Sequence, residues 1–177
     1  MKKLLFSSLA MAVVSTGFCY TKGDLSVDSN QKTWSKDGIS VTARLEQKEY
    51  SIQEPINLEI IITNNSNADI FVILSNPLKQ FKFTMLNKEQ NKSVSLMPFG
   101  KQLENQEFFR RIVKKIESKK NYTEKIDMKS LFDMSLSGEY SISFEGSYLN
   151  NSKEKFINFK IEDINFSIKK EDERQKK

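Results

Sequence analysis

The stretch LFDMSLSGEYSISF, residues 131–144, decides the fold. Gly138 allows the chain to turn tightly, and the residues that follow it alternate between apolar and polar side chains. Tyr140, Ile142 and Phe144 share one side of this alternation, while serine and glutamate occupy the other. A period of two residues is typical of a strand with one face in a core and one face in water.

Tyr140 has a structural explanation. A tyrosine on the apolar side of a strand buries its ring and must still satisfy its hydroxyl, because an unpaired buried polar group costs on the order of 1–3 kcal/mol. A Gly-x-Tyr sequence at the start of a strand is typical of the tyrosine corner of Greek-key sandwiches. We therefore expect Gly138 and Tyr140 to be structural residues, with the hydroxyl bonded to the backbone between residues 131 and 135.

The same alternation recurs along the chain. ISVTARLE (residues 39–46) places Ile39, Val41, Ala43 and Leu45 on one side, and further β-branched runs follow, separated by turn sequences such as NNSNAD. The pattern predicts an all-β fold of seven to nine strands, an antiparallel immunoglobulin-like β-sandwich with Greek-key order, over residues 39–168. One short helix is expected within residues 101–120.

The final run, FINFKIEDINFSI (residues 156–168), changes parity in its middle. Ile157, Phe159 and Ile161 hold one parity, and the later apolar residues hold the other. A β-bulge inserts one residue and would reconcile the two halves. We expect that bulge near residues 162–163.

The two ends of the chain differ from the body. Lys2 and Lys3 precede a short apolar run, so residues 1–19 are predicted to be a secretory signal peptide. Cys19 is the only cysteine; a lipid anchor there is disfavoured by the large Phe18 before it but stays open. Residues 20–38 form a polar segment, and residues 169–177 form a charged tail expected to be disordered. No later segment has the ~20 apolar residues of a transmembrane helix.

The charge and the residue types exclude several functions. The net charge of +5 includes two lysines of the predicted signal and an excess of two in the tail, which leaves the body near +1 and argues against nucleic acid as a partner. The chain contains no histidine, which removes the usual general base and the commonest zinc ligand. We therefore expect no enzyme activity, no metal and no cofactor. A carboxylate hydrolase would need two acids in one cleft, whereas Glu46 and Glu59 are predicted to face solvent.

A long irregular segment, residues 98–120, is the predicted binding surface. Long connections in compact domains are uncommon and are often functional, and aromatic residues and arginines are enriched at interfaces. The candidate partner-binding residues are Phe99, Leu103, Phe108, Phe109, Arg110 and Arg111.

Two segments, Glu54–Leu78 and Ile126–Tyr140, carry a resemblance. With their N-N-S turn and their Gly-x-Tyr ending, they resemble secreted bacterial immunoglobulin-like domains, similar to the N-terminal domain of lysine-specific metalloendopeptidases. Those peptidases add a zinc domain built on His-Glu-x-x-His, and a chain without histidine lacks that domain. The resemblance implies an immunoglobulin-like fold without peptidase activity.

These observations predict an exported, periplasmic or secreted, non-enzymatic binding or accessory module that recognises a protein or a cell-envelope component. Two alternatives stay open. A secreted proteinase inhibitor would present one rigid loop, within residues 98–109. A carbohydrate-binding module would need exposed aromatic side chains, which Trp34, Phe99 or Tyr148 could supply. The sequence leaves the oligomeric state open.

Overall fold

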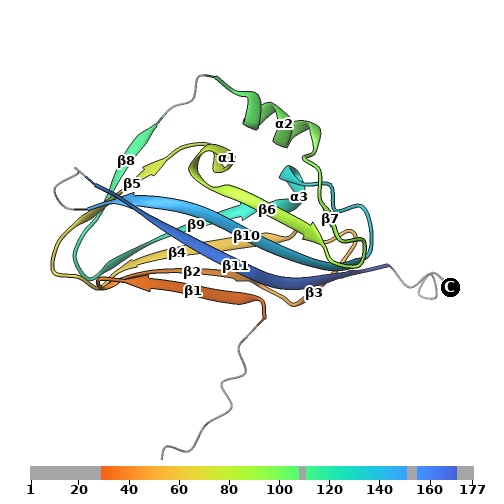
Figure 1. Ribbon diagram of the computed structural model, residues 1–177, viewed down its shortest axis with the longest axis horizontal. Coiled ribbons are helices and arrows are strands. Elements are labelled where there is room, and N and C mark those ends of the chain that lie inside the picture. Colours follow the sequence, from red (N-terminus) through yellow and green to blue (C-terminus); the bar gives the residue numbers. More distant parts are fainter. Residues whose placement is uncertain (1–28, 108–110, 151–154, 171–177) are drawn as a thin grey trace, which may run out of the picture.

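Two β-sheets pack face to face in the computed structural model, which describes residues 29–107, 111–150 and 155–170 (Figure 1). Eleven strands and three helices lie within these ranges. The predicted all-β sandwich is confirmed, although the described residues form more strands than the seven to nine expected and more helices than the one expected. The predicted signal peptide, Cys19 and residues 171–177 of the tail lie outside the described residues.

The smaller sheet has four strands in the order β1-β2-β4-β9. They are β1 (Gln31–Lys36), β2 (Ile39–Leu45), β4 (Asn57–Asn64) and β9 (Lys120–Asp127). Alternate side chains of β2 and β4 are buried, as the period of two residues predicts. β1 and β2 form a hairpin in which Lys36 pairs with Ile39, so the turn at residues 37–38 is a two-residue loop.

The larger sheet has seven strands arranged around β10. They are β3 (Glu49–Ser51), β5 (Ile70–Leu74), β6 (Lys82–Asn87), β7 (Lys92–Ser93), β8 (Ile112–Ile116), β10 (Gly138–Leu149) and β11 (Phe156–Lys169). β10 pairs with β11 on one edge, and with β6 and then β5 on the other. The expectation of a purely antiparallel sandwich has one exception, because β3 crosses from the end of β2 to the other sheet and pairs parallel with β11.

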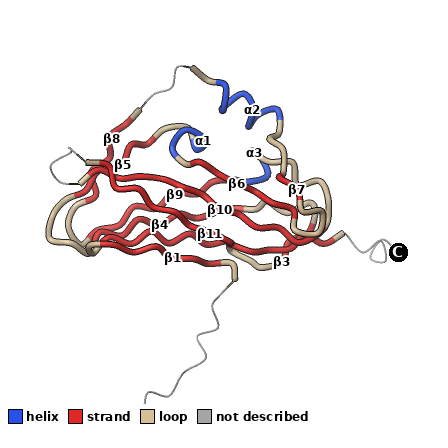
Figure 2. The backbone as a smooth tube through the Cα atoms, viewed as in Figure 1, coloured by secondary structure: helices blue, strands red, loops and turns tan. Residues whose placement is uncertain are grey.

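Three short helices lie beside the larger sheet (Figure 2): α1 (Pro77–Gln80), α2 (Pro98–Asn105) and α3 (Met128–Leu131). The helix expected within residues 101–120 is α2, which ends at Asn105. A helical continuation through Ile112 and Ile116 is wrong, since these residues begin and end strand β8. Their spacing of four places them on one side of a strand as well as of a helix, and the β-branched Ile-Val pair at the start favours the strand.

The predicted bulge in the last strand is present. The pairing of β10 with β11 shifts between Ile142 and Phe144, which face Ile164 and Ile161 respectively. Asp163 lies in the extra stretch with a backbone φ of 57°, and its carboxylate accepts a hydrogen bond from the hydroxyl of Ser141 at 3.2 Å. The bulge lets both halves of β11 bury their apolar residues.

The tyrosine corner is also present, with a different acceptor. Tyr140 is 1% exposed and stacks on Phe166 of β11, with 5.5 Å between ring centroids. Its hydroxyl donates to the carbonyl of Leu136 at 2.7 Å, just beyond the predicted residues 131–135. The turn between Leu136 and Tyr140 is tight because Gly138 adopts a φ of 143°, a region that L side chains rarely occupy. The backbone carbonyl of Leu136 therefore lies within reach of the Tyr140 hydroxyl, four residues later in the sequence.

Two strands of the smaller sheet were not expected from the sequence. β1 lies within the predicted polar segment 20–38 and has a single large apolar residue, Trp34. β9 places Tyr122, Glu124 and Ile126 on its more buried side, so a charged residue interrupts the apolar alternation. In both strands the pairing partner, rather than an apolar pattern, defines the element.

Candidate functional site

Helix α2 rests closely on α3 through Gly100. This glycine is buried, and a Cβ atom at its position would lie 2.4 Å from the carbonyl oxygen of Leu131. Contacts under 3.0 Å to backbone atoms are not tolerated, so a side chain here would push α2 away from the sandwich. Gly100 thus sets the distance between α2 and the body of the protein.

Hydrogen bonds fix both ends of α2. At its start, the backbone N–H of Met97 donates to the carbonyl of Leu131 at 2.9 Å. At its end, the side-chain amide of Asn76 donates to the carbonyl of Leu103 at 2.9 Å and to the side chain of Gln106 at 3.2 Å. Asn76 is also the N-cap of α1, where it accepts from the N–H of Lys79. Helix α2 is therefore held in a defined position against α1 and α3.

Exposed large apolar side chains concentrate between Met97 and Val113. Of the six such residues that the described ranges contain, Leu136 and Phe156 lie elsewhere. The other four are Met97 (38% exposed), Phe99 (51%), Ile112 (46%) and Val113 (56%). We call these four residues the α2–β8 surface. Figure 1 shows α2 and β8 on the side of the molecule away from the four-stranded sheet, separated from each other. Single exposed apolar residues are ordinary, but their concentration in one segment marks a candidate interaction surface.

Strand β8 forms one edge of the seven-stranded sheet. It pairs antiparallel with β5 along all five of its residues, from Ile112 opposite Leu74 to Ile116 opposite Ile70. No described strand pairs with its other side. Ile116 is buried, whereas the four residues before it are exposed. The β5–β8 pair touches the rest of the sheet through one registered pair, Phe71 with Leu149.

A buried asparagine anchors the end of β8. The Asn64 side-chain amide, in a residue 0% exposed, donates to the carbonyls of Ala68 at 2.8 Å and Ile116 at 3.0 Å. Its oxygen accepts from the backbone N–H and the hydroxyl of Ser66. Because Asn64 ends β4 of the other sheet, these bonds tie the two sheets together where β8 ends.

The charges on β8 are mostly basic. Lys115 lies 3.2 Å from Glu117 and 3.5 Å from Asp69, and its side-chain bond to Glu117, with the charge of Asp69, raises the pKa of Lys115. Lys114 is exposed and makes no ion pair with any described residue. The strand therefore presents one neutralised and one unpaired ammonium group.

The predicted binding residues have different positions. Phe99 and Arg111 are exposed, and Leu103 is half-buried and packs against the core from the inner side of α2. Phe108, Phe109 and Arg110 lie outside the described residues. The sequence did not reveal Ile112 and Val113 as exposed strand residues, because a helix was expected within residues 101–120. The lysine pair that follows them was the available signal of an exposed strand.

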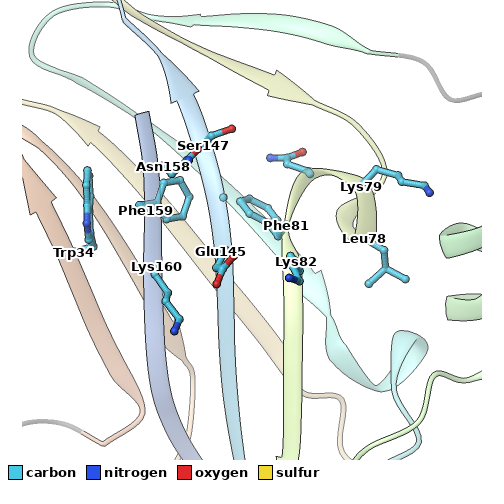
Figure 3. A pocket seen from close by; sticks show the side chains of 12 residues that line it. Trp34, Leu78, Lys79, Phe81, Lys82, Glu145, Ser147, Asn158, Phe159 and Lys160 are labelled. Atoms are coloured by element: carbon cyan, nitrogen blue, oxygen red, sulfur yellow. The ribbon is translucent and has the colours of Figure 1, made fainter. Parts of the chain in front are cut away.

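A cleft of about 540 Å³ lies elsewhere, over strands β1, β11, β10 and β6 (Figure 3). Trp34 lines it and packs on Phe159, with 5.9 Å between ring centroids. Trp34 is partly buried and packs against the core, as an edge residue does. Lys82, Glu145 and Lys160 form a row across neighbouring strands. Glu145 is the single carboxylate among the lining residues, so this cleft holds no pair of acids.

Two carboxylates do meet in a smaller cleft on the four-stranded sheet, and both are ion-paired. Arg44 lies 2.5 Å from Glu59, and Lys125 lies 3.4 Å from Glu46 and 4.0 Å from Glu59. Glu59 is mostly covered, with a side chain 14% exposed, which differs from the solvent-facing position expected from its parity. Arg44 and Lys125 both form ion pairs with it. The geometry is that of a structural ion network on a sheet face.

Two further properties bear on function. Among residues 29–107, 111–150 and 155–170, no group of three or more Cys, Asp or Glu side chains could hold a metal ion. None of the described helices has the length and apolar character needed to cross a membrane.

Comparison with known proteins gave no relative. No known protein-family model matches the chain, and a search of the curated proteins found no match.

Proposed function

We propose that this protein is an exported, non-enzymatic, immunoglobulin-like binding module that recognises a protein partner through the α2–β8 surface. The observation that carries the proposal is the concentration of exposed apolar residues between Met97 and Val113, at helix α2, which is fixed at both ends, and on strand β8. A preformed surface of this kind loses little conformational entropy when it binds.

The sequence supports the rest of the proposal. Lys2, Lys3 and the apolar run after them favour export, and the resemblance of residues 54–78 and 126–140 to secreted immunoglobulin-like domains favours a module of that type. The absence of histidine from the chain favours binding over catalysis, because most acid–base and nucleophilic mechanisms use that residue.

Affinity capture with surface variants tests this function. The mature protein, tagged and expressed in its native cell, is recovered from the cell envelope together with the proteins bound to it. The double substitution F99S/V113S removes two exposed anchors of the α2–β8 surface. We expect a protein that accompanies the wild type to be reduced at least tenfold with this variant, since each buried apolar side chain contributes about 1.5–3 kcal/mol.

Leu136→Ser is the matched control, because Leu136 is 52% exposed and lies outside the α2–β8 surface. Its backbone carbonyl, which accepts from Tyr140, is unchanged by the substitution. We expect L136S to recover the same partner as the wild type. Equal recovery with both variants, when all three proteins have the same thermal unfolding midpoint, would remove the α2–β8 surface from the proposal.

A further inference from the structure

We infer that β8 binds an extended segment of the partner as an additional antiparallel strand, with an acidic residue of that segment opposite Lys114. This inference rests on the proposed function and specifies how the partner is bound. An edge strand leaves alternate backbone N–H and C=O groups directed away from the sheet, where they can pair with another chain. Residues 112–115 of β8 have no described strand on that side.

The anchoring of β8 makes this edge a stable template. Its last carbonyl, on Ile116, is held by the amide of Asn64, and its inner side is paired with β5 over its whole length. The conformational entropy lost on binding is therefore mainly that of the incoming strand. The exposed Ile112 and Val113 lie on opposite faces of β8, so the added strand can place one apolar residue beside each of them.

Charge favours an acidic occupant. Residues 97–116 contain five basic and two acidic residues. The ammonium of Lys114 has no ion-pair partner among the described residues, whereas that of Lys115 already contacts Asp69 and Glu117. A carboxylate directly across from Lys114 would therefore meet an available charge on the same face of the sheet.

The same charges disfavour a second copy of this chain. If two β8 strands paired antiparallel about their centres, Lys114 of each copy would lie directly opposite its counterpart. Like charges opposite each other destabilise a strand pair, and lysine on an edge strand is a common protection against self-association. A segment with an acid in this position replaces that repulsion by attraction.

The sequence that the added strand must have follows from its register opposite β8. Read antiparallel to β8, an acid opposite Lys114 is followed by apolar residues opposite Val113 and Ile112. The probe is the peptide acetyl-Ser-Thr-Glu-Val-Val-Thr-Ser-amide. Titrated into ¹⁵N-labelled mature protein, it is expected to shift the amide resonances of residues 112–115 and of β5, while those of β3 stay unchanged.

N-methylation separates strand pairing from side-chain contact. Two versions of the peptide carry N-methyl groups on alternate residues, in opposite phases, with identical side chains. Because only alternate N–H groups of an added strand point at β8, one phase is expected to weaken binding more than tenfold and the other to bind like the parent. Equal binding by both phases, or no shift in residues 112–115 at millimolar peptide, would overturn the inference.

A charge reversal tests the role of Lys114. K114E is expected to weaken the peptide about fivefold, the size of one exposed ion pair, and the loss should shrink at high salt. K92E makes the same change on another exposed lysine, in β7, and is expected to bind like the wild type. Equal weakening by both variants would overturn the acidic preference. If the peptide does not bind but F99S/V113S still loses the captured partner, binding by strand addition to β8 is ruled out, while the proposed function stands.

Discussion

Two tyrosines of β10 show how single residues define this fold. Tyr140 and Tyr148 are both 1% exposed and both lie in the core. The hydroxyl of Tyr140 bonds to Leu136, while that of Tyr148 has no hydrogen-bond partner among the described residues. Parity in the sequence was enough to place Tyr140 in the core. It could not identify the acceptor, which depends on the backbone angles of the turn at Gly138.

The two hydroxyls predict opposite results for the same substitution. Tyr140→Phe leaves the Leu136 carbonyl without its donor and is expected to lower the free energy of unfolding by about 1 kcal/mol. Tyr148→Phe removes a group that gains no bond and is expected to leave stability unchanged or slightly higher. Urea denaturation of both variants measures the difference. A loss of equal size in both would contradict the tyrosine corner as a stabilising contact.

At the scale of elements, the strands that the sequence revealed are those with an uninterrupted apolar side. β2, β4 and the two halves of β11 were predicted from alternation alone. β9 was missed because Glu124 occupies an inward position, and β8 because Ile112 and Ile116 fit a helix as well as a strand. For the candidate site, the sequence indicated the segment of residues 98–120. It did not indicate which of these residues are exposed, because that depends on how Gly100 and Asn76 hold α2.

Glu124 helps to protect β9, an edge strand, from pairing with another chain. An inward-pointing charge on an edge strand discourages pairing with another chain. Burial raises the pKa of Glu124, and the hydrogen bond that its carboxylate accepts from Gln80, at 2.7 Å, partly opposes this. A raised pKa means that the folded protein binds this proton more tightly than the unfolded chain, so the ionised carboxylate costs stability.

Replacing Glu124 by glutamine is therefore expected to raise the free energy of unfolding by an amount that depends on pH. The glutamine carbonyl can still accept from Gln80 but carries no charge, so E124Q is expected to be more stable than the wild type at pH 8. The gain should shrink as the pH falls through the raised pKa toward about pH 4.5, where the wild-type carboxyl becomes neutral. Unfolding midpoints in urea at several pH values measure this. A constant difference across that range would contradict it.

For the whole molecule, the sequence predicted a sandwich of the Greek-key type but not which particular strands pair. Periodicity reports which side of a strand is buried and carries no information about its neighbours. The parallel pairing of β3 with β11, and the position of β10 at the centre of the larger sheet, depend on the summed packing of residues distant in sequence. The identity of the proposed partner could not be predicted for a related reason, since an exposed surface contains only one side of an interface.

The last strand is predicted to be essential for the entire fold. β11 contributes five buried apolar residues to the core, namely Phe159, Ile161, Ile164, Phe166 and Ile168. Their burial contributes about 7.5–15 kcal/mol, which is as large as the ~5–15 kcal/mol that stabilises a typical domain. A chain ending at Asn150 is expected to show no cooperative thermal transition by circular dichroism, whereas the full chain shows one. A cooperative transition in the shortened chain would contradict this.

The central place of β10 also determines when folding can begin. β3, β5 and β6 are synthesised first, yet each pairs with β10 or β11, and both of these strands lie beyond residue 137. Contacts so distant in sequence form slowly. The larger sheet therefore cannot close around its centre until residues 138–169 have left the ribosome.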